Sequence, residues 1–231
     1  MLQFTDKKTK LFFYLILFIL LSTQIAKDHN ISKSSTIKSN HIEVFGLSNE
    51  NNLKVLKSLN SLSFQNIFFI NQSNFYKILK ENNLIESFYI KKFYPNVIKI
   101  NIKQTDFLAI TTKKNKKFYI GSNGKLIPVG DVKDFNKELP FVFSKSNYAD
   151  FVNLKKIIDK SKFVFEEIES FYYFPSNRWD LKTNSGLLIK LPEKNILESL
   201  QFAYLIEKNR KFKNNKIIDL RISNRIIVSD E

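Results

Sequence analysis

Hydrophobic and polar positions divide this 231-residue chain into three stretches with different periodicities. The first is an uncharged apolar run from Leu11 to Ala26, which follows three lysines within residues 1–10. As a helix this run would extend roughly 24 Å, against roughly 30 Å for the hydrocarbon core of a bilayer. The pattern predicts one transmembrane helix over residues 11–26, with residues 1–10 in the cytoplasm because short basic segments stay on that side.

A cleaved signal peptide is the alternative interpretation of the same run, because a basic start is also typical of export signals. Against cleavage, Gln24 stands two residues before Ala26, where a small-x-small site needs a small side chain. Both interpretations send the rest of the chain across the membrane. It begins with a polar linker over residues 27–38.

The second stretch, residues 39–105, changes between strand-type and helix-type periodicity. Alternation and a period near 3.6 residues predict, in order, a strand at 41–46, helices at 51–62 and 73–83, and strands at 86–94 and 97–104. An apolar connector over residues 64–70 joins the helices. This order predicts one compact α+β unit.

The third stretch, residues 106–231, reads as a β-rich domain with two helices. Turn residues predict hairpins at Asn123-Gly124 and at Asn184 to Gly186. The remaining pattern predicts a strand at 163–169, helices at 148–160 and 192–210, a Ser223-Asn224 turn and a last strand from Arg225 to Val228. The fold class is therefore α+β, with an N-terminal transmembrane helix and two domains.

Charge and cysteine content narrow the possible partners and chemistry. The formal net charge of +15 is typical of nucleic-acid binding, but only four of the basic residues are arginines, the residues that most base readers use. The lysines are spread along the chain apart from a cluster at Lys113 to Lys117, which sits at a predicted loop tip. A basic surface near anionic lipid or an acidic envelope polymer stays open as an alternative to plain solvation. The absence of cysteine excludes disulfides and thiol chemistry.

No combination of residues predicts an active site, a cofactor site or a metal site. The two histidines, His29 and His41, lie in the linker and at the first strand, away from any partner for catalysis. Glu166 and Glu167 are adjacent, so on a strand they face opposite sides. Trp179 is expected in the core. We expect Asp180 and Asp219 to cap turns or pair with Arg178 or Arg221, and the protein not to be an enzyme.

The order of several short motifs resembles the FtsQ/DivIB family of bacterial cell-division proteins over nearly the whole chain. These motifs are IEVFG at 42–46, NIF at 66–68, FYPN at 93–96, Ile100 and Ile102, LP at 139–140, RWDL at 178–181, Gly186, LP at 191–192 and DLR at 219–221. The resemblance implies a POTRA domain at residues 39–105 and the family's β domain at 106–231. It also implies a non-enzymatic divisome scaffold in the bacterial inner membrane at the septum, with its bulk in the periplasm.

The resemblance further implies partners: the coiled-coil division proteins FtsB and FtsL and, indirectly, the septal peptidoglycan synthase complex. Members of the family bind FtsB with the last strands of the β domain. The matching positions here are Arg221, Ile222, Arg225, Ile226, Ile227 and Val228, with Arg178 near another contact. Two departures affect the contact chemistry: Ile222 stands where some members have Tyr, and neither Trp nor Gly follows Val228.

A physical argument supports the same site independently. A final strand after a turn is expected at a sheet edge, where unpaired backbone groups accept a partner strand. The alternative is that residues 225–228 only complete the sheet. Two other functions are alternatives to the divisome scaffold: another POTRA-containing envelope assembly or secretion factor, and an enzyme acting on cell-wall polymer. An assembly or secretion factor usually carries a transmembrane β-barrel, for which the C-terminal stretch is too short. An enzyme would need a nucleophile or an acid/base pair, and the sequence offers no plausible one.

Overall fold

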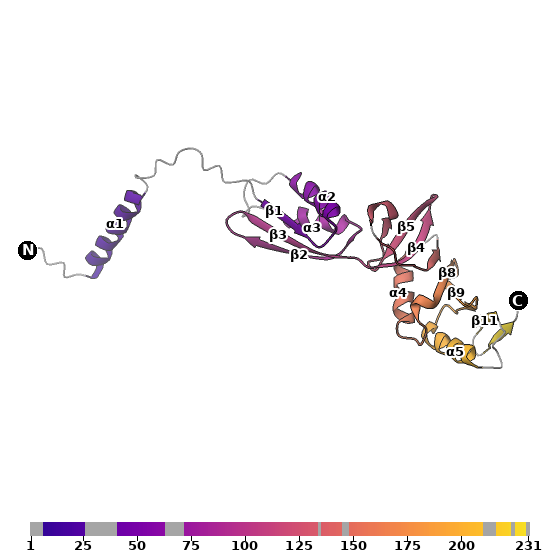
Figure 1. Ribbon diagram of the computed structural model, residues 1–231. Coiled ribbons are helices and arrows are strands. Elements are labelled where there is room, and N and C mark those ends of the chain that lie inside the picture. The colour runs from indigo at the N-terminus through magenta and orange to yellow at the C-terminus, as the bar shows by residue number, and fades with distance from the viewer. Residues whose placement is uncertain are drawn as a thin grey trace, which may run out of the picture.

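The computed structural model describes residues 7–25, 41–62, 72–133, 135–144, 148–209, 216–222 and 225–229 (Figure 1). Helix α1 comes first, and two β-sheets with their helices follow. The predicted linker at 27–38, the connector at 64–70 and the Ser223-Asn224 turn lie outside the described residues.

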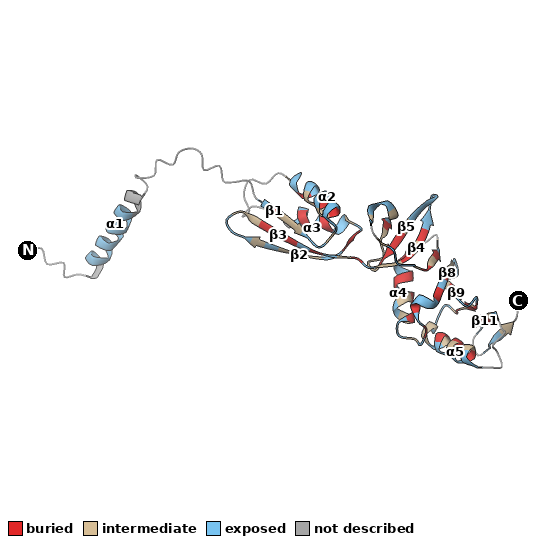
Figure 2. Ribbon diagram, in the orientation of Figure 1, coloured by how far each residue is buried: buried red, intermediate tan, exposed pale blue. Residues whose placement is uncertain are grey.

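Helix α1 (Lys7–Ile25) covers most of the apolar N-terminal run. Every side chain from Leu11 to Leu21 is exposed (Figure 2). The helical part of the N-terminal prediction is confirmed. Among the described residues, however, no helix combines the length and apolar content that crossing a bilayer requires. The membrane span stays a prediction.

The first sheet has three strands in the order β1-β3-β2. Strand β1 (His41–Phe45) runs parallel to β3 (Val97–Gln104), and β2 (Ile85–Phe93) runs antiparallel to β3. Helices α2 (Asn49–Asn60) and α3 (Gln72–Glu81) cover one face, where a core of strand isoleucines meets apolar residues of both helices. The predicted order of strand, helix, helix, strand, strand is confirmed. The parallel β1–β3 pair forms because the two helices carry the chain across the sheet.

The second sheet has nine strands in the order β12-β11-β10-β9-β8-β7-β4-β5-β6. The strands are β4 (Phe107–Lys113), β5 (Lys116–Gly121), β6 (Leu126–Pro128), β7 (Phe141–Phe143), β8 (Ile168–Phe174), β9 (Arg178–Thr183), β10 (Leu188–Lys190), β11 (Ile217–Asp219) and β12 (Ile227–Ser229). Helices α4 (Ala149–Ile158) and α5 (Ile196–Lys208) and the short 3-10 helices η2 (Val129–Asp131) and η3 (Phe165–Glu167) complete this part. Trp179 is buried in its core beside Phe151 and Phe171, as predicted.

Several element boundaries differ from the prediction, among them the last strand, which spans Ile227–Ser229 and not residues 225–228. The strand expected at 163–169 begins only at Ile168, because Phe165 turns into the core against Phe151 and Phe171 and the backbone forms the 3-10 turn η3 instead. The helix expected from Pro192 begins at Ile196. Asn195 precedes it with a left-handed φ of 58°, so the helix cannot extend further back.

Side chains from both sheets meet at a joint between them. Leu84, just before β2, is buried with Tyr119 and Ile127 of the nine-stranded sheet. Next to this apolar contact, the Asn123 side chain donates to the Asn83 carbonyl at 3.0 Å, and the Asn83 side chain donates to the Leu126 carbonyl at 2.9 Å. The second sheet is therefore attached to the first by specific side-chain contacts as well as by the chain itself.

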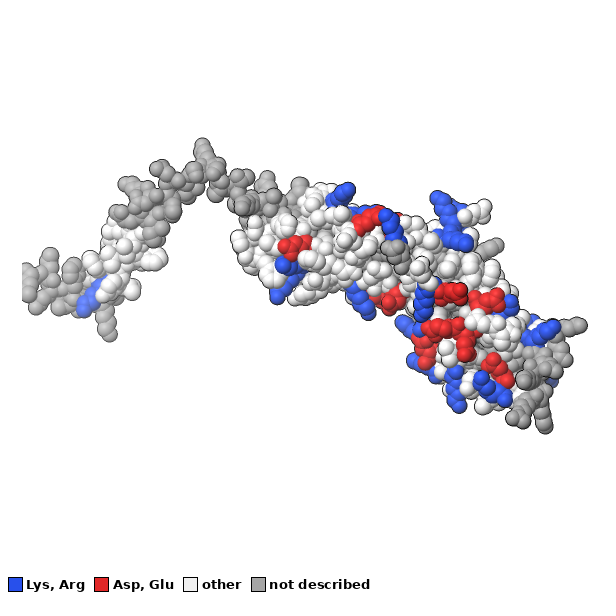
Figure 3. Space-filling model, viewed as in Figure 1, with Lys and Arg blue, Asp and Glu red and all other residues white. Residues whose placement is uncertain are grey.

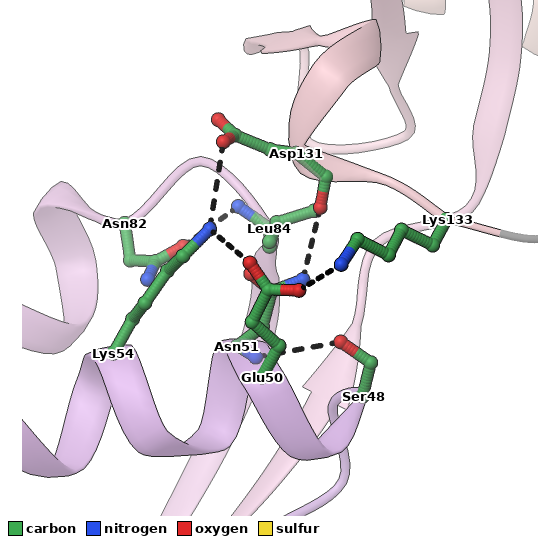
Figure 4. A network of polar contacts seen from close by, with 8 residues as sticks. All are labelled: Ser48, Glu50, Asn51, Lys54, Asn82, Leu84, Asp131 and Lys133. Carbon is green, nitrogen blue, oxygen red and sulfur yellow. Dashed lines mark hydrogen bonds and ion pairs between the residues drawn. The ribbon is translucent and has the colours of Figure 1, made fainter.

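A charged network forms another part of the joint (Figure 4). Glu50 on α2 lies 2.6 Å from the Lys133 ammonium and 3.3 Å from that of Lys54, which also lies 3.7 Å from Asp131. Hydrogen bonds from Lys133 and then Lys54 lower the pKa of Glu50. Because Asp131 and Lys133 follow β6, the network ties α2 directly to the second sheet.

Candidate partner-binding site

Strand β12 lies at one edge of the nine-stranded sheet. It pairs antiparallel with β11, with Ile227 opposite Asp219, Val228 opposite Ile218 and Ser229 opposite Ile217. The other side of β12 meets no strand among the described residues. The position of the last strand at a sheet edge therefore follows the physical argument made from the sequence; its role in binding stays a prediction.

Hydrogen bonding of β11 shows which backbone groups of β12 face outward. The Leu220 N–H donates to the Lys190 carbonyl, and the Lys216 carbonyl accepts from the Leu188 N–H, so Ile218, between them on β11, faces β10. At the end of the pair, the Lys216 N–H donates to the Ser229 carbonyl of β12 at 3.0 Å. Because neighbouring residues alternate, the backbone groups of Ile217 and Asp219 point toward β12, where they pair with those of the opposite residues Ser229 and Ile227. Val228, between these two pairs, directs its N–H and carbonyl away from the sheet.

Apolar side chains surround this free edge. Ile222, Ile226 and Ile227 are all exposed, whereas Val228 is half-buried against the core. Isoleucines with this degree of exposure next to unpaired backbone groups are typical of a surface that receives another chain.

A hollow of about 810 Å³ lies beside the same segment. Its walls are the start of α5 and residues around 220–226, including Glu198, Phe202, Ile222 and Ile226. Both apolar and charged residues line the hollow, so it has room and suitable contacts for a side chain of another molecule next to the edge of the sheet.

Arg221 is held by Asp219, two residues earlier. The Arg221 Nε lies 2.9 Å and 3.0 Å from the two carboxylate oxygens, and a terminal nitrogen lies 2.5 Å from Oδ2. The hydrogen bonds from Arg221 lower the pKa of Asp219, and those to Asp219 raise the pKa of Arg221. The predicted pairing of Asp219 with Arg221 is confirmed.

Asp180 does not form the ion pair or turn cap that the sequence suggested. It is buried on β9, and its Oδ1 has no hydrogen-bond partner among the described residues. Burial raises the pKa of Asp180, while Arg221, Lys190 and Arg178 act in the opposite direction. No ion pair of Asp180 is found among the described residues, and Arg221, one of the two arginines expected to pair with it, pairs with Asp219 instead.

The structure gathers some of the predicted site residues and separates another. Ile222, Arg225 and Ile226 line the hollow together with Arg221. Arg178 lies three strands away on β9, where its Nε donates to Ser176 at 2.8 Å. It shares only the electrostatic environment of Asp180 with Arg221.

Phe202 also lines the hollow, and the sequence did not predict it as part of the candidate site. It lies on α5 and is 55% exposed. Its position on the helix could have indicated this: Leu200 and Ala203 of α5 are buried, and Phe202, between them in the sequence, lies on the opposite, outer face of the helix. A large aromatic residue on the outer face of an amphipathic helix was the clue.

Comparisons with known proteins agree with the resemblance found in the sequence. The family model described as "Cell division protein FtsQ/DivIB, C-terminal" matches residues 109–221, and the model described as "POTRA domain, FtsQ-type" matches residues 37–104. The two models together cover most of the chain.

Curated relatives point the same way. The chain is 28% identical over 205 residues to Cell division protein FtsQ of Rickettsia bellii, which covers 86% of this chain and 76% of that protein. It is 26% identical over 205 residues to Cell division protein FtsQ of Rickettsia conorii, with the same coverage. It is 32% identical over 108 residues to Cell division protein DivIB of Staphylococcus pseudintermedius, covering 47% of this chain and 32% of that protein. The chain therefore belongs to the FtsQ/DivIB family of cell-division proteins.

Proposed function

We propose that this protein is a bitopic scaffold of the division machinery that recruits FtsB and FtsL and links them to septal peptidoglycan synthesis. Membership of the FtsQ/DivIB family supports the role in cell division. The single observation that carries the recruiting role is the free edge of β12, with exposed Ile222, Ile226 and Ile227 beside a hollow.

The proposed contact is strand addition at β12. A partner segment pairs with the outward N–H and carbonyl of Val228, and main-chain hydrogen bonds of this kind supply affinity. Side chains of the partner then select for this site: an apolar group enters the hollow beside Phe202 and Ile226. Arg225 favours an acidic group at the same place, because charge complementarity orients the partner, whereas Arg221 is already paired with Asp219.

The proposed topology places residues 1–10 in the cytoplasm, α1 in the inner membrane, and the POTRA domain (39–105) and β domain (106–231) in the periplasm. The exposed apolar surface of α1 supports this proposal, since a helix that is apolar on all sides needs an apolar environment. In this scheme the protein works by holding partners, without catalytic groups of its own.

A binding measurement with a backbone variant tests the site. The full chain, solubilised in detergent, is immobilised and exposed to the periplasmic parts of FtsB and FtsL from the same organism. Val228→Pro removes the outward N–H and is expected to weaken binding at least tenfold. Ile227→Pro is a poorer test, because Ile227 faces β11 and the change breaks pairing within the sheet.

Val228→Thr is the matched control, because threonine keeps the N–H and the branched shape. We expect it to bind as the unchanged chain does. Circular dichroism and thermal unfolding must show that both variants remain folded. Full binding by a folded Val228→Pro variant would exclude strand addition at β12, and no binding by the unchanged chain would exclude the proposed partners.

A further inference from the structure

The turn between β2 and β3 carries the features of a membrane-contacting surface. Figure 1 shows this turn at the end of the three-stranded sheet that is farthest from the nine-stranded sheet. We call the residues Tyr89, Lys91, Phe93, Tyr94 and Lys99 at this end the hairpin tip. They form a group because β2 and β3 pair in register, with Lys91 opposite Lys99 and Phe93 opposite Val97.

Three aromatic side chains of the hairpin tip are open to solvent. Tyr89 is 63%, Tyr94 61% and Phe93 39% exposed. Tyr89 and Phe93 share one face of β2 because successive side chains alternate. Helices α2 and α3 pack on the opposite face, so this face of the sheet is left open among the described residues. A monomeric domain rarely exposes aromatic residues in such a group without a function.

Lysines lie among these rings. The Lys91 Nζ is 4.9 Å and the Lys99 Nζ 5.4 Å from the centre of the Phe93 ring. One carboxylate shares the face: Glu43 lies 3.0 Å from the Lys99 Nζ and 3.7 Å from His41 Nε2. Because Glu43 faces Lys99, the positive charge of Lys91 is left for another partner.

The point where the chain enters the sheet lies directly beside the hairpin tip. The His41 N–H donates to the carbonyl of Asn96, in the turn, at 2.8 Å, and His41 is opposite Val97 in the sheet. Residues 26–40 connect this point to α1, and a segment of that length reaches at most roughly 50 Å when extended. The hairpin tip is therefore the part of the two sheets most directly tethered to α1.

We propose that the hairpin tip docks on the anionic headgroups of the membrane that holds α1. Tyrosine favours the headgroup layer, where its apolar ring and polar end are both accommodated, and phenylalanine inserts at the boundary between headgroups and acyl chains. Lysines near an anionic leaflet add electrostatic attraction. This inference rests on the membrane anchorage proposed above. Docking here directs the nine-stranded sheet, at the other end of the molecule, away from the bilayer.

Fluorescence quenching in vesicles tests the docking. The chain has no cysteine, so Asn101→Cys, on the open face of β3, accepts one fluorophore, and Asn60→Cys at the end of α2 supplies a reference position. Each labelled full chain is reconstituted into vesicles of phosphatidylcholine, or of phosphatidylethanolamine with phosphatidylglycerol, that contain a lipid with a quencher on its headgroup. We expect stronger quenching at Asn101 than at Asn60, and only in the anionic vesicles.

Charge variants show whether the hairpin tip is responsible. Lys91→Gln with Lys99→Gln removes the charge of Lys91 and the charge of Lys99 that Glu43 offsets, so docking is expected to weaken at least about fivefold, the contribution of one lysine near an anionic surface. Lys116→Gln with Lys117→Gln, on the exposed β4–β5 hairpin, makes the same charge change elsewhere and is expected to leave quenching unaltered.

Flotation of the same vesicles separates this proposal from the anchorage. A chain that floats with both vesicle types but shows equal quenching at Asn101 and Asn60 would overturn the docking and leave the anchorage standing. Equal loss of quenching in both pairs of lysine variants would also overturn it, because general charge would then explain the effect. A chain that floats with neither vesicle type would overturn both proposals.

Discussion

Asn51 on helix α2 donates its side-chain amide to the backbone carbonyl of Asp131 at 3.0 Å, a contact between residues 80 positions apart (Figure 4). Asn51 is buried, so the bond is shielded from water. It joins the first sheet's helix to the segment after β6. The relative position of the two sheets therefore depends on individual side chains as well as on the apolar contact around Leu84.

Asn51→Ala tests this joint. The change removes the amide and leaves the Asp131 carbonyl without its partner, so we expect a loss of about 1–2 kcal/mol in the free energy of unfolding. Urea unfolding of the full chain in detergent measures it. Asn60→Ala, at the exposed end of the same helix, should change stability by less than about 0.5 kcal/mol. Equal stability of both variants would show that the contact contributes nothing.

Gly46 permits the tight passage from β1 to α2. Its φ is +110°, and a Cβ at this position would lie 1.8 Å from the carbonyl oxygen of Ile102. Gly46→Ala is therefore expected to cost more than about 2 kcal/mol in unfolding free energy. Gly130→Ala is the matched control, since a Cβ there meets nothing within 4 Å. A Gly46→Ala chain as stable as the control would contradict the predicted clash.

Asp180→Asn should make the protein more stable at pH 7. Burial raises the pKa of Asp180 in the folded state, so the ionised form opposes folding at neutral pH. We expect a gain in the free energy of unfolding that disappears as the pH falls below about 4, where the carboxyl is protonated in both states. Thermal unfolding between pH 3 and pH 7 measures the change. A loss of stability at pH 7 would mean that the carboxylate is satisfied by its basic neighbours.

Asp219→Asn should have the opposite effect. The hydrogen bonds from Arg221 lower the pKa of Asp219, so the pair stabilises the fold above the ordinary carboxyl pKa of about 3.9 and stops doing so as the pH falls through the lowered value. We expect a loss of about 1 kcal/mol at pH 7 that shrinks toward pH 2. The same thermal series measures it, and a loss independent of pH would contradict the ion pair as its cause.

Phe202→Ala tests the hollow as a contact for the proposed partner. Phe202 lines it, and truncating a large side chain at the centre of an interface commonly costs more than about 1.4 kcal/mol, which is tenfold in affinity. Titration with the periplasmic part of FtsB measures the dissociation constant. Leu205→Ala is the control: Leu205 is 59% exposed on the same helix but outside the hollow. Equal affinities of the two variants would remove the hollow from the binding site.

The sequence was informative where a local pattern decides the structure. Alternation at Ile98, Ile100 and Ile102 places the core face of β3, and Asn123-Gly124 places a hairpin, because both depend on neighbouring residues. It failed where distant contacts decide. Residues around Phe165 have the pattern of a strand, but the Phe165 ring packs against Phe151 and the backbone forms a 3-10 turn. The residues around Asp180 in the sequence do not indicate that Arg221 pairs with Asp219 instead of Asp180.

The sequence predicts where in the chain the candidate binding site lies, but not the surface that it forms. A last strand after a turn indicated an edge, and β12 occupies one. The outward direction of Val228 depends on how β11 pairs with β10, and the hollow depends on where α5 lies beside residues 220–226. The direction of Val228 and the shape of the hollow both depend on packing between segments that are far apart in the sequence.

The joint between the two sheets also determines the distance between the hairpin tip and β12. The hairpin tip lies at one end of the molecule and β12 near the other (Figure 1), so in the proposed arrangement the two sheets would separate the membrane from the bound partner. About half or more of each side chain is exposed in the charged network drawn in Figure 4, which consists of Glu50, Lys54, Asp131 and Lys133. Figure 3 shows charged side chains of both signs on the visible face of the molecule. In the proposed arrangement, a rotation of the second sheet at this joint would change the distance between the bilayer and a partner bound at β12, so losing these few contacts would alter that distance.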